Sequence, residues 1–304
     1  MPTLMPYLPA LTRFALLIIA LCYTQIALAA PLLVSSIRPL HIIAQELAGD
    51  YAQTRLLLPP SVSPHLYQLK PSDRLLLQQA DRLFWVGPEL ERFLVKPVAR
   101  LSLEQPIALL HIEGIAMIDG DQGSQHDHHG HDHQGIDPHI WLSIDNVRVI
   151  AERITAELIA IDPAHRAQYA ENLHRFVAKL TLLDQQTAKR LLPLKDRGYV
   201  LLHDGYSHFE ERYGLRRLEA FSLSPDRTPG AKHLLVIRRL LDSGSVACIF
   251  REPQYQPAVL ATIVGDRPIR QGLLDPLASQ AVDYADFYQQ FSIAFERCLS
   301  GTGV

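Results

Sequence analysis

Histidines crowd one short stretch of this chain, and imidazole is a ligand that suits zinc, copper and nickel. Residues 125–141 read QHDHHGHDHQGIDPHIW and hold six of the fourteen histidines in the chain. Five of them stand among acidic and small residues, with no apolar side chain to bury: His126, His128, His129, His131 and His133. We expect a solvated, mobile loop over residues 119–136 that collects metal weakly, because ordering it around an ion costs conformational entropy. The alternative is a loop that serves only as a spacer.

The sixth histidine of this stretch, His139, has a different setting. Pro138 stiffens the backbone before it, and the apolar residues 140–142 follow it. A histidine at the edge of buried structure can be held in one place, which a tight metal site requires. His139 is therefore a candidate for a defined site, in contrast to the histidines of the loop.

Two further histidines and one acidic residue stand where predicted strands end. His65 lies beyond the strand-like residues 54–59, His203 directly follows residues 199–202, and Asp275 follows residues 269–273. The histidines are separated by 74 and 64 residues (139 − 65 and 203 − 139), far more than the ligands of a zinc finger. A site that uses them must therefore be assembled by folding.

The elements that must position these residues alternate between short apolar strands and amphipathic helices. Strands are expected at residues 32–37, 54–59, 81–86 and 107–112, and again at 199–202, 218–221, 246–250 and 269–273. Helices are expected at residues 41–47, 71–80, 143–161, 207–213, 230–243, 257–264 and 284–299. This alternation predicts parallel sheets covered by helices, and ligands of such sheets lie beyond the carboxyl ends of the strands.

One long helix is expected in the middle of the chain, over residues 162–193. Asp162 and Pro163 suit its first turn, and Pro193 lies at its far end. About 30 helical residues would make a rod of roughly 45 Å, which is long for one domain. The predicted fold class is α/β, with two small lobes, each a mostly parallel sheet flanked by helices, joined by this spanning helix. The lobes are expected at residues 30–161 and 194–304.

The composition is that of a globular protein without a basic footprint for nucleic acid. The 304 residues are 48% hydrophobic and 20% charged, with a formal net charge of −3 and a sequence pI near 6.5. A nucleic-acid partner is therefore not expected. A small molecule or an ion is the more natural ligand.

The N-terminal residues match a secretory signal peptide. Arg13 precedes the apolar residues 14–22, and Ala27-Leu28-Ala29 supplies an A-x-A cleavage pattern. The apolar core is much shorter than the roughly 20 residues that span a bilayer, which disfavours the alternative of a membrane anchor. We expect a cleaved signal at residues 1–29 and a mature chain in the periplasm of a Gram-negative cell.

Export also bears on the three cysteines. Cleavage of the signal removes Cys22 and leaves Cys248 and Cys298, an even pair in an exported protein. A disulfide between them is expected. Two separate buried thiols are the alternative.

Eight motifs, in order along the mature chain, are similar to those of one protein family. They are SIRP at 36–39, HxYxxxPSD at 65–73, WVGPELE at 85–91, PHIWLS at 138–143, HDGY at 203–206, PG at 229–230, EPQY at 252–255 and LDPL at 274–277. In these motifs the chain resembles the ZnuA-like zinc-binding proteins, which belong to the periplasmic metal-binding proteins of ABC importers. The resemblance covers the whole mature chain.

The resemblance implies a set of metal ligands. His65, His139 and His203 would bind zinc, and Asp275 stands where relatives place an acidic ligand or a near neighbour of the metal. It also implies the acidic, histidine-rich loop and the Cys248–Cys298 disulfide. Similar proteins often carry an acidic residue just before the first ligand, where this chain has Pro64, so the fourth position is left to water or to Asp275. Three imidazoles and one oxygen suit zinc, whereas manganese prefers more oxygen ligands.

The function implied by the resemblance is transport. The protein would not be an enzyme but a binding protein, expected as a monomer, that delivers zinc to a membrane permease driven by a cytoplasmic ATPase. A manganese or iron importer component is an alternative that differs only in cargo. A zinc hydrolase is a third, because three histidines and a water also form a catalytic arrangement, with Asp275 or Glu252 as its general base.

Overall fold

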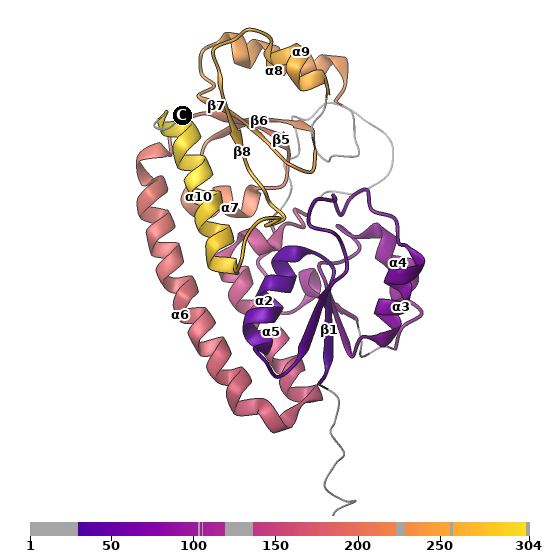
Figure 1. The fold of residues 1–304 in the computed structure, drawn as a ribbon. Helices are drawn as coiled ribbons and strands as arrows, with labels where there is room; N and C mark the ends of the chain where they lie inside the picture. The colour runs from indigo at the N-terminus through magenta and orange to yellow at the C-terminus, as the bar shows by residue number, and fades with distance from the viewer. Residues whose placement is uncertain are drawn as a thin grey trace, which may run out of the picture. The chain divides into compact units, whose positions relative to one another are not determined.

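Two separate four-stranded sheets, each with only parallel strand pairs, form the framework of the described chain (Figure 1). The computed structural model describes residues 30–102, 104, 106–118, 136–222, 229–255 and 258–301. Residues from Pro31 onward cluster as one compact unit. The expected signal peptide at residues 1–29 and the histidine-rich loop lie outside the described residues.

The first sheet, with the strand order β2-β1-β3-β4, defines the first lobe. Its strands are β1 (Leu32–Ser35), β2 (Gln53–Leu56), β3 (Arg82–Trp85) and β4 (Pro106–Ala108). The central strands β1 and β3 are almost entirely buried, as is typical of parallel strands covered by helices on both faces. β4 is shorter than the strand expected at 107–112, because the chain turns into a 3₁₀ helix, Leu109–His111, that buries two leucines.

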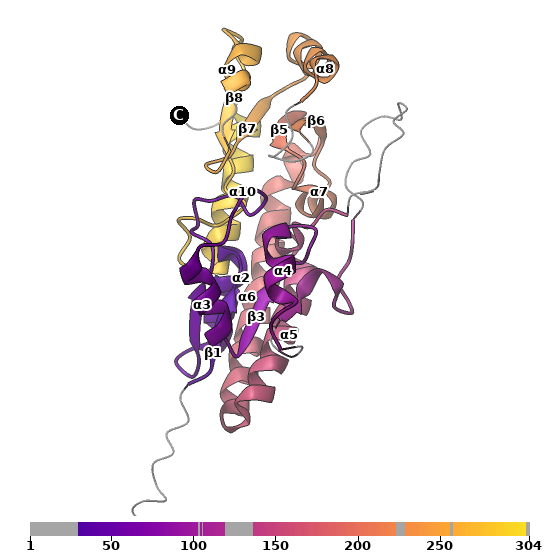
Figure 2. The ribbon, with the colours of Figure 1, turned by 90° about the vertical axis from the view of Figure 1, so that its right-hand side faces the viewer.

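Helices cover both faces of this sheet. They are α2 (Arg38–Ala48), α3 (Pro71–Gln79), the single turn α4 (Val95–Val98) and α5 (Ile144–Ile161). Figure 1 shows α2 and α5 on one face and α3 and α4 on the other, and the view in Figure 2 agrees. α2 and α3 each carry a proline in the first turn, where its missing N–H leaves no hydrogen bond unmade. Ser143 caps α5 by accepting a hydrogen bond from the backbone N–H of Asn146 at 3.3 Å.

The long helix expected at 162–193 is present, although it is divided into three segments. A 3₁₀ turn, Pro163–His165, precedes α6 (Arg166–Leu191), and a second turn, Leu192–Leu194, follows it. Asp162 accepts hydrogen bonds from the His165 ring and the Tyr169 hydroxyl, which favours the tight turn at this end. The residues that α6 buries recur every three or four positions, the spacing of one face of a helix: Tyr169, Asn172, Phe176, Leu180, Leu183, Thr187 and Leu191.

The second sheet has the strand order β6-β5-β7-β8 and defines the second lobe. Its strands are β5 (Tyr199–His203), β6 (Arg217–Ser222), β7 (Cys248–Arg251) and β8 (Arg270–Leu273). The helices are α7 (Ser207–Tyr213), α8 (Ala231–Asp242), α9 (Ala258–Val264) and α10 (Tyr284–Ser300). In Figure 1, α8 and α9 lie on one face of this sheet and α7 and α10 on the other. The predicted fold class is thereby confirmed, while the exact lobe boundaries stay predictions.

One hydrophobic core continues from the first lobe into the second. It includes Leu33 of β1, Phe176 of α6, Phe250 of β7 and Phe295 of α10. A smaller apolar cluster lies between the second sheet and the helices α8 and α9. α6 extends along both lobes, and α10 runs beside the part of α6 that lies along the second lobe (Figures 1 and 2). The lobes are therefore joined by packed side chains as well as by the chain itself.

Two further expectations concern covalent and membrane structure. Cys248, at the start of β7, forms a disulfide with Cys298 in α10, as predicted. None of the described helices combines the length and the hydrophobicity that crossing a membrane requires.

Candidate metal site

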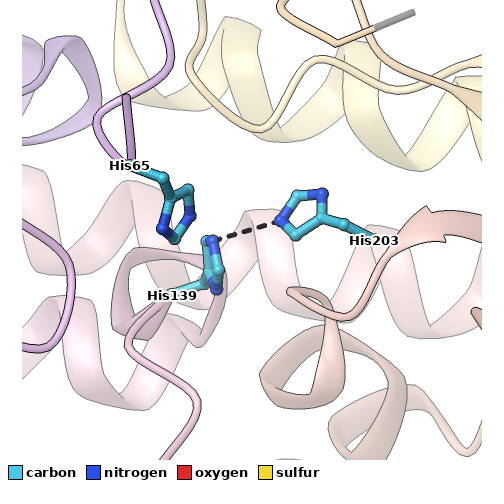
Figure 3. Close-up of side chains that lie close together, drawn as sticks. All are labelled: His65, His139 and His203. Atoms are coloured by element: carbon cyan, nitrogen blue, oxygen red, sulfur yellow. Dashed lines mark hydrogen bonds between the residues drawn. The ribbon is translucent and has the colours of Figure 1, made fainter. Parts of the chain in front are cut away.

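Three histidines that are far apart in the sequence meet between the two lobes. His65 lies in the loop between β2 and α3, His139 directly precedes the 3₁₀ helix Ile140–Leu142, and His203 is the last residue of β5. One ring nitrogen of each lies within 4.8 Å of those of the other two. Figure 3 shows the three side chains converging on one place. The structure thus brings together all three histidines that the sequence singles out.

The separation of two of these nitrogens matches that of two ligands of one zinc ion. The Nε2 atoms of His139 and His203 lie 3.4 Å apart, along the dashed line of Figure 3. Zinc binds imidazole nitrogen at about 2.0–2.1 Å, so two corners of a zinc tetrahedron lie roughly 3.3–3.4 Å apart. This pair therefore has the spacing that a shared zinc ion needs.

A buried carboxylate holds the ring of His139. Asp137 Oδ1 accepts a hydrogen bond from Nδ1 of His139 at 2.6 Å and another from its backbone N–H at 2.9 Å. Asp137 and His139 are only 4% and 3% exposed. The Asp137 charge fixes the ring with Nδ1–H as the donor, which leaves the lone pair of Nε2 directed at the site.

A second buried carboxylate holds the ring of His203 in the same manner. Glu252, one residue beyond β7, accepts through Oε1 from Nδ1 of His203 at 2.6 Å and from the hydroxyl of Tyr206 at 2.7 Å. Nε2 of His203 is thereby also left with a free lone pair. Two lone pairs facing each other at this distance repel, and either a proton shared in a hydrogen bond between the rings or a metal ion bound to both nitrogens relieves that repulsion.

The contacts between these carboxylates and histidines also shift the pKa values of His203 and Asp137. Burial alone would lower the pKa of His203, but the charge and hydrogen bond of Glu252 outweigh it and raise that pKa above its ordinary value. Burial favours the protonated form of Asp137, yet its interactions with His139 outweigh this and lower the pKa of Asp137 below its ordinary value. The anionic Asp137 is therefore the form present at neutral pH.

His65 is held differently from the other two histidines. Its Nε2 is buried and has no hydrogen-bond partner among the described residues. Burial and the neighbouring rings of His139 and His203 lower its pKa well below the ordinary value, so the ring is neutral at neutral pH. Its loop is fixed by Tyr67, whose hydroxyl donates to Asp73 of α3 at 2.7 Å. An unpaired, buried imidazole nitrogen costs free energy that a metal ion would recover.

Gly205 leaves the space in front of two of these rings. A Cβ atom at this position would lie 2.7 Å from Cε1 of His139 and still closer to Nε2 of His203. The glycine of the HDGY motif is therefore required by the close approach of the backbone to the site.

Comparison with known proteins supports one family. The model of the family ZnuA, described as "Zinc-uptake complex component A periplasmic", matches residues 33–298. The high-affinity zinc uptake system protein ZnuA of Yersinia pestis is 35% identical over 293 residues, which cover 90% of this chain and 92% of that protein. The protein of the same name from Haemophilus ducreyi is 36% identical over 287 residues, covering 88% and 92%. The chain belongs to the ZnuA family.

The fold agrees with this assignment to the ZnuA family. A crystal structure of ZnuA superposes with a TM-score of 0.76 at 24% identity, over 90% of this chain and 99% of that one. The two-lobed α/β arrangement predicted from the alternating pattern is thus also the fold of that crystal structure.

Asp275, the acidic residue that the ZnuA-like motifs suggested as a ligand or near neighbour, lies outside the three-histidine group. Its Oδ1 accepts from Nε2 of Gln254 at 2.7 Å and from the N–H of Leu277 at 3.1 Å. Its Oδ2 accepts from the N–H of Ser279 at 2.7 Å and from the hydroxyl of that residue. The carboxylate is fully engaged by its own lobe, and its role as a metal ligand stays a prediction.

Sequence reasoning did not identify the two carboxylates that hold His139 and His203. Asp137 stands two residues before His139, a spacing at which an aspartate accepts a hydrogen bond from the later backbone N–H. That local pattern is a signal that could have revealed it. Glu252 belongs to the EPQY motif, but its contact with His203 joins positions 49 residues apart, so no local pattern indicates that contact.

Proposed function

We propose that this protein captures zinc in the periplasm and delivers it to a membrane permease driven by a cytoplasmic ATPase. The observation that supports it most is the convergence of His65, His139 and His203, each able to present a neutral imidazole nitrogen. The relatives from Yersinia pestis and Haemophilus ducreyi are named as high-affinity zinc uptake system proteins. Zinc would be the cargo and not a resident cofactor.

The donor set favours zinc over manganese or iron. The described group of potential ligands contains three imidazoles and no carboxylate, with a fourth position left for water or for Asp275. Zinc accepts such a nitrogen-rich tetrahedron readily, whereas manganese favours oxygen donors.

The same contacts argue against the zinc hydrolase. A general base must be free to take a proton from a metal-bound water. Glu252 already accepts hydrogen bonds from His203 and Tyr206, and Asp275 is engaged by Gln254, Leu277 and Ser279. Glu252 contacts Nδ1 of His203, on the side of the ring away from Nε2, and Asp275 lies outside the three-histidine group, so neither carboxylate is placed as a base for a water bound there.

Metal titration of the mature chain tests the proposal. Wild-type protein should bind one tight equivalent of zinc, and His139→Ala or His203→Ala should lose it, because either change removes one of two ligands set 3.4 Å apart. His174→Ala, on the exposed side of α6, is the matched control and should bind as wild type. Tight zinc binding retained in both His139→Ala and His203→Ala would contradict the proposed function.

The histidine-rich loop is proposed as a weak auxiliary reservoir for the same ion. Deletion of residues 121–135 should abolish additional low-affinity equivalents and leave the tight one in place, because the three ligands lie outside the deleted stretch. Unchanged stoichiometry after the deletion would mean that the loop is only a spacer.

A further inference from the structure

Asp137 forms hydrogen bonds both with His139, the candidate zinc ligand, and with α7 of the second lobe. All of its polar atoms are engaged. Its backbone N–H donates to the carbonyl of Ile118 at 2.9 Å, and Oδ1 accepts the two hydrogen bonds from His139. Its remaining two acceptors turn the other way, toward α7. Asp137 thus joins a metal ligand to a helix 70 residues further along the chain.

The contacts with α7 are specific hydrogen bonds. Oδ2 of Asp137 accepts from the backbone N–H of Ser207 at 3.1 Å, and its carbonyl oxygen accepts from Nε2 of His208 at 3.0 Å. Nδ1 of His208 in turn accepts from Nδ2 of Asn146 in α5 at 3.5 Å. The N-terminal turn of α7 is therefore docked on the segment that carries His139.

We propose that Asp137 is a positioning residue that holds His139 as an Nε2 ligand and couples zinc binding at that ring to the docking of α7. This inference rests on the proposed function. A metal ion on Nε2 draws electron density from the ring and strengthens the Nδ1–H···Oδ1 bond. Coupling between two sites is reciprocal, so zinc should stabilise the α7 contact as much as that contact stabilises zinc binding.

Glu252 offers an instructive contrast. Both of its described hydrogen bonds, from His203 and Tyr206, use Oε1 and stay within the second lobe. Asp137 uses Oδ1 for His139 and Oδ2 for Ser207. An amide at position 137 cannot serve both sides, because its NH₂ group would face a donor in either orientation. Asp137→Asn therefore breaks the coupling while keeping the shape of the side chain.

The chain offers a matched control for this substitution. Asp162 accepts from Nδ1 of His165 at 2.6 Å, the same ring-to-carboxylate distance as in the Asp137–His139 pair, but it follows the C-terminal end of α5, the end away from His139. The test compares wild type, Asp137→Asn and Asp162→Asn. It measures zinc affinity by competition titration and amide hydrogen exchange at Ser207 with and without zinc. Zinc affinity should fall 10- to 100-fold in Asp137→Asn, the usual effect of losing a carboxylate behind a ligating histidine. Asp162→Asn should stay within about threefold of wild type.

Hydrogen exchange at Ser207 distinguishes a positioning role of Asp137 from a general loss of structure in the variant. In wild type and Asp162→Asn, zinc should slow exchange at Ser207, and in Asp137→Asn that zinc-dependent protection should be lost. Equal zinc affinity in Asp137→Asn and Asp162→Asn, or no zinc effect at Ser207 in wild type, would overturn the inference. If wild-type protein bound no tight zinc, the proposed function itself would fail, so the two failures are distinguishable.

Wild-type protein provides a second measurement in case Asp137→Asn does not fold. Nitrogen-15 NMR of the zinc-loaded chain should show His139 with a coordinated Nε2 and a slowly exchanging Nδ1–H. A ring coordinated through Nδ1, or an Nδ1–H that exchanges rapidly with solvent, would contradict the role given to Asp137.

Discussion

Gly205 shows how much of the site depends on a single residue. Its backbone passes so close to the rings of His139 and His203 that any Cβ would occupy the space between them. Gly205 does not have a positive φ angle, so alanine is compatible with the backbone itself. Glycine is needed at this position because a Cβ would clash with the two rings, and not because of the backbone conformation.

Gly205→Ala should therefore abolish tight zinc binding and leave the fold intact. We expect a loss of at least 100-fold in zinc affinity, about 2.7 kcal/mol, because the methyl group would clash with the rings of His139 and His203 and displace them. Gly230→Ala is the control, since a Cβ there would meet no atom within 4 Å. Isothermal titration and thermal unfolding of both variants would check this, and wild-type affinity in Gly205→Ala would contradict the account.

The pH dependence of zinc binding follows from the pair of His203 and Glu252. Only the unprotonated imidazole binds metal, and the pKa of His203 is raised by Glu252 despite burial. Zinc affinity should therefore begin to fall as the pH drops through that raised pKa, above the ordinary histidine value of about 6.5. In Glu252→Gln, Oε1 can still accept both hydrogen bonds but the charge is lost, so the decline should begin at lower pH. Titrations between pH 5 and 8 that show the same onset in both proteins would refute this.

The same pairs show the limit of sequence reasoning at this scale. His65, His139 and His203 could be found because each lies near the end of a predicted strand or beside an apolar run. Glu252 and Ser207 could not be paired with their partners, because those contacts join positions 49 and 70 residues apart. Local sequence patterns show which predicted helix or strand a residue follows. Contacts between distant positions form only when the chain has folded, so local patterns do not predict them.

At the scale of elements, short strands that end in polar residues position the chemistry. His203 is the last residue of the buried strand β5, and Glu252 follows β7 directly. β5 and β7 are neighbours with a parallel register, so their carboxyl ends meet at one edge of the sheet. The helices and strands were predictable because prolines, glycines and apolar spacing mark their limits, and the main error, at β4, arose where an apolar run continued into a turn.

The disulfide adds stability to this second sheet. Cys248 and Cys298 close a loop across 50 residues and tie β7 to α10. Removing both sulfurs in a Cys248→Ala, Cys298→Ala variant should lower the free energy of unfolding by roughly 2–4 kcal/mol, because the unfolded chain regains that loop's freedom. Zinc affinity should stay within about threefold of wild type, since Cys248 pairs with Tyr199, at the opposite end of β5 from His203. Denaturant unfolding with an unchanged free energy would contradict this.

At the scale of the whole molecule, the continuous core and a polar tether restrict movement between the lobes. Arg38, the first residue of α2, donates from Nε to the carbonyl of Ala278 at 2.9 Å and from Nη2 to that of Ala281 at 2.5 Å. These carbonyls belong to the segment that follows Asp275 in the second lobe. Closure on a metal ion should therefore be small, because large hinge motion would break the shared core.

Arg38→Ala should accelerate zinc release. Losing the tether loosens the second-lobe segment against α2, and we expect the dissociation rate to rise about three- to tenfold. Arg267→Ala is the matched control, because Arg267 also donates to two carbonyls, those of Ile263 and Val264, but within one lobe. Stopped-flow release into a chelator would measure both variants. Equal dissociation rates in Arg38→Ala and Arg267→Ala would show that the tether has no part in retaining the ion.

One zinc ion should be shared by three histidines from the two lobes. Crystals of the mature protein grown with one equivalent of zinc, with diffraction recorded on both sides of the zinc absorption edge, test it most directly. The account predicts one strong anomalous peak within about 2.0–2.1 Å of a ring nitrogen of each of His65, His139 and His203. A peak elsewhere, or one that leaves out any of the three, would contradict it.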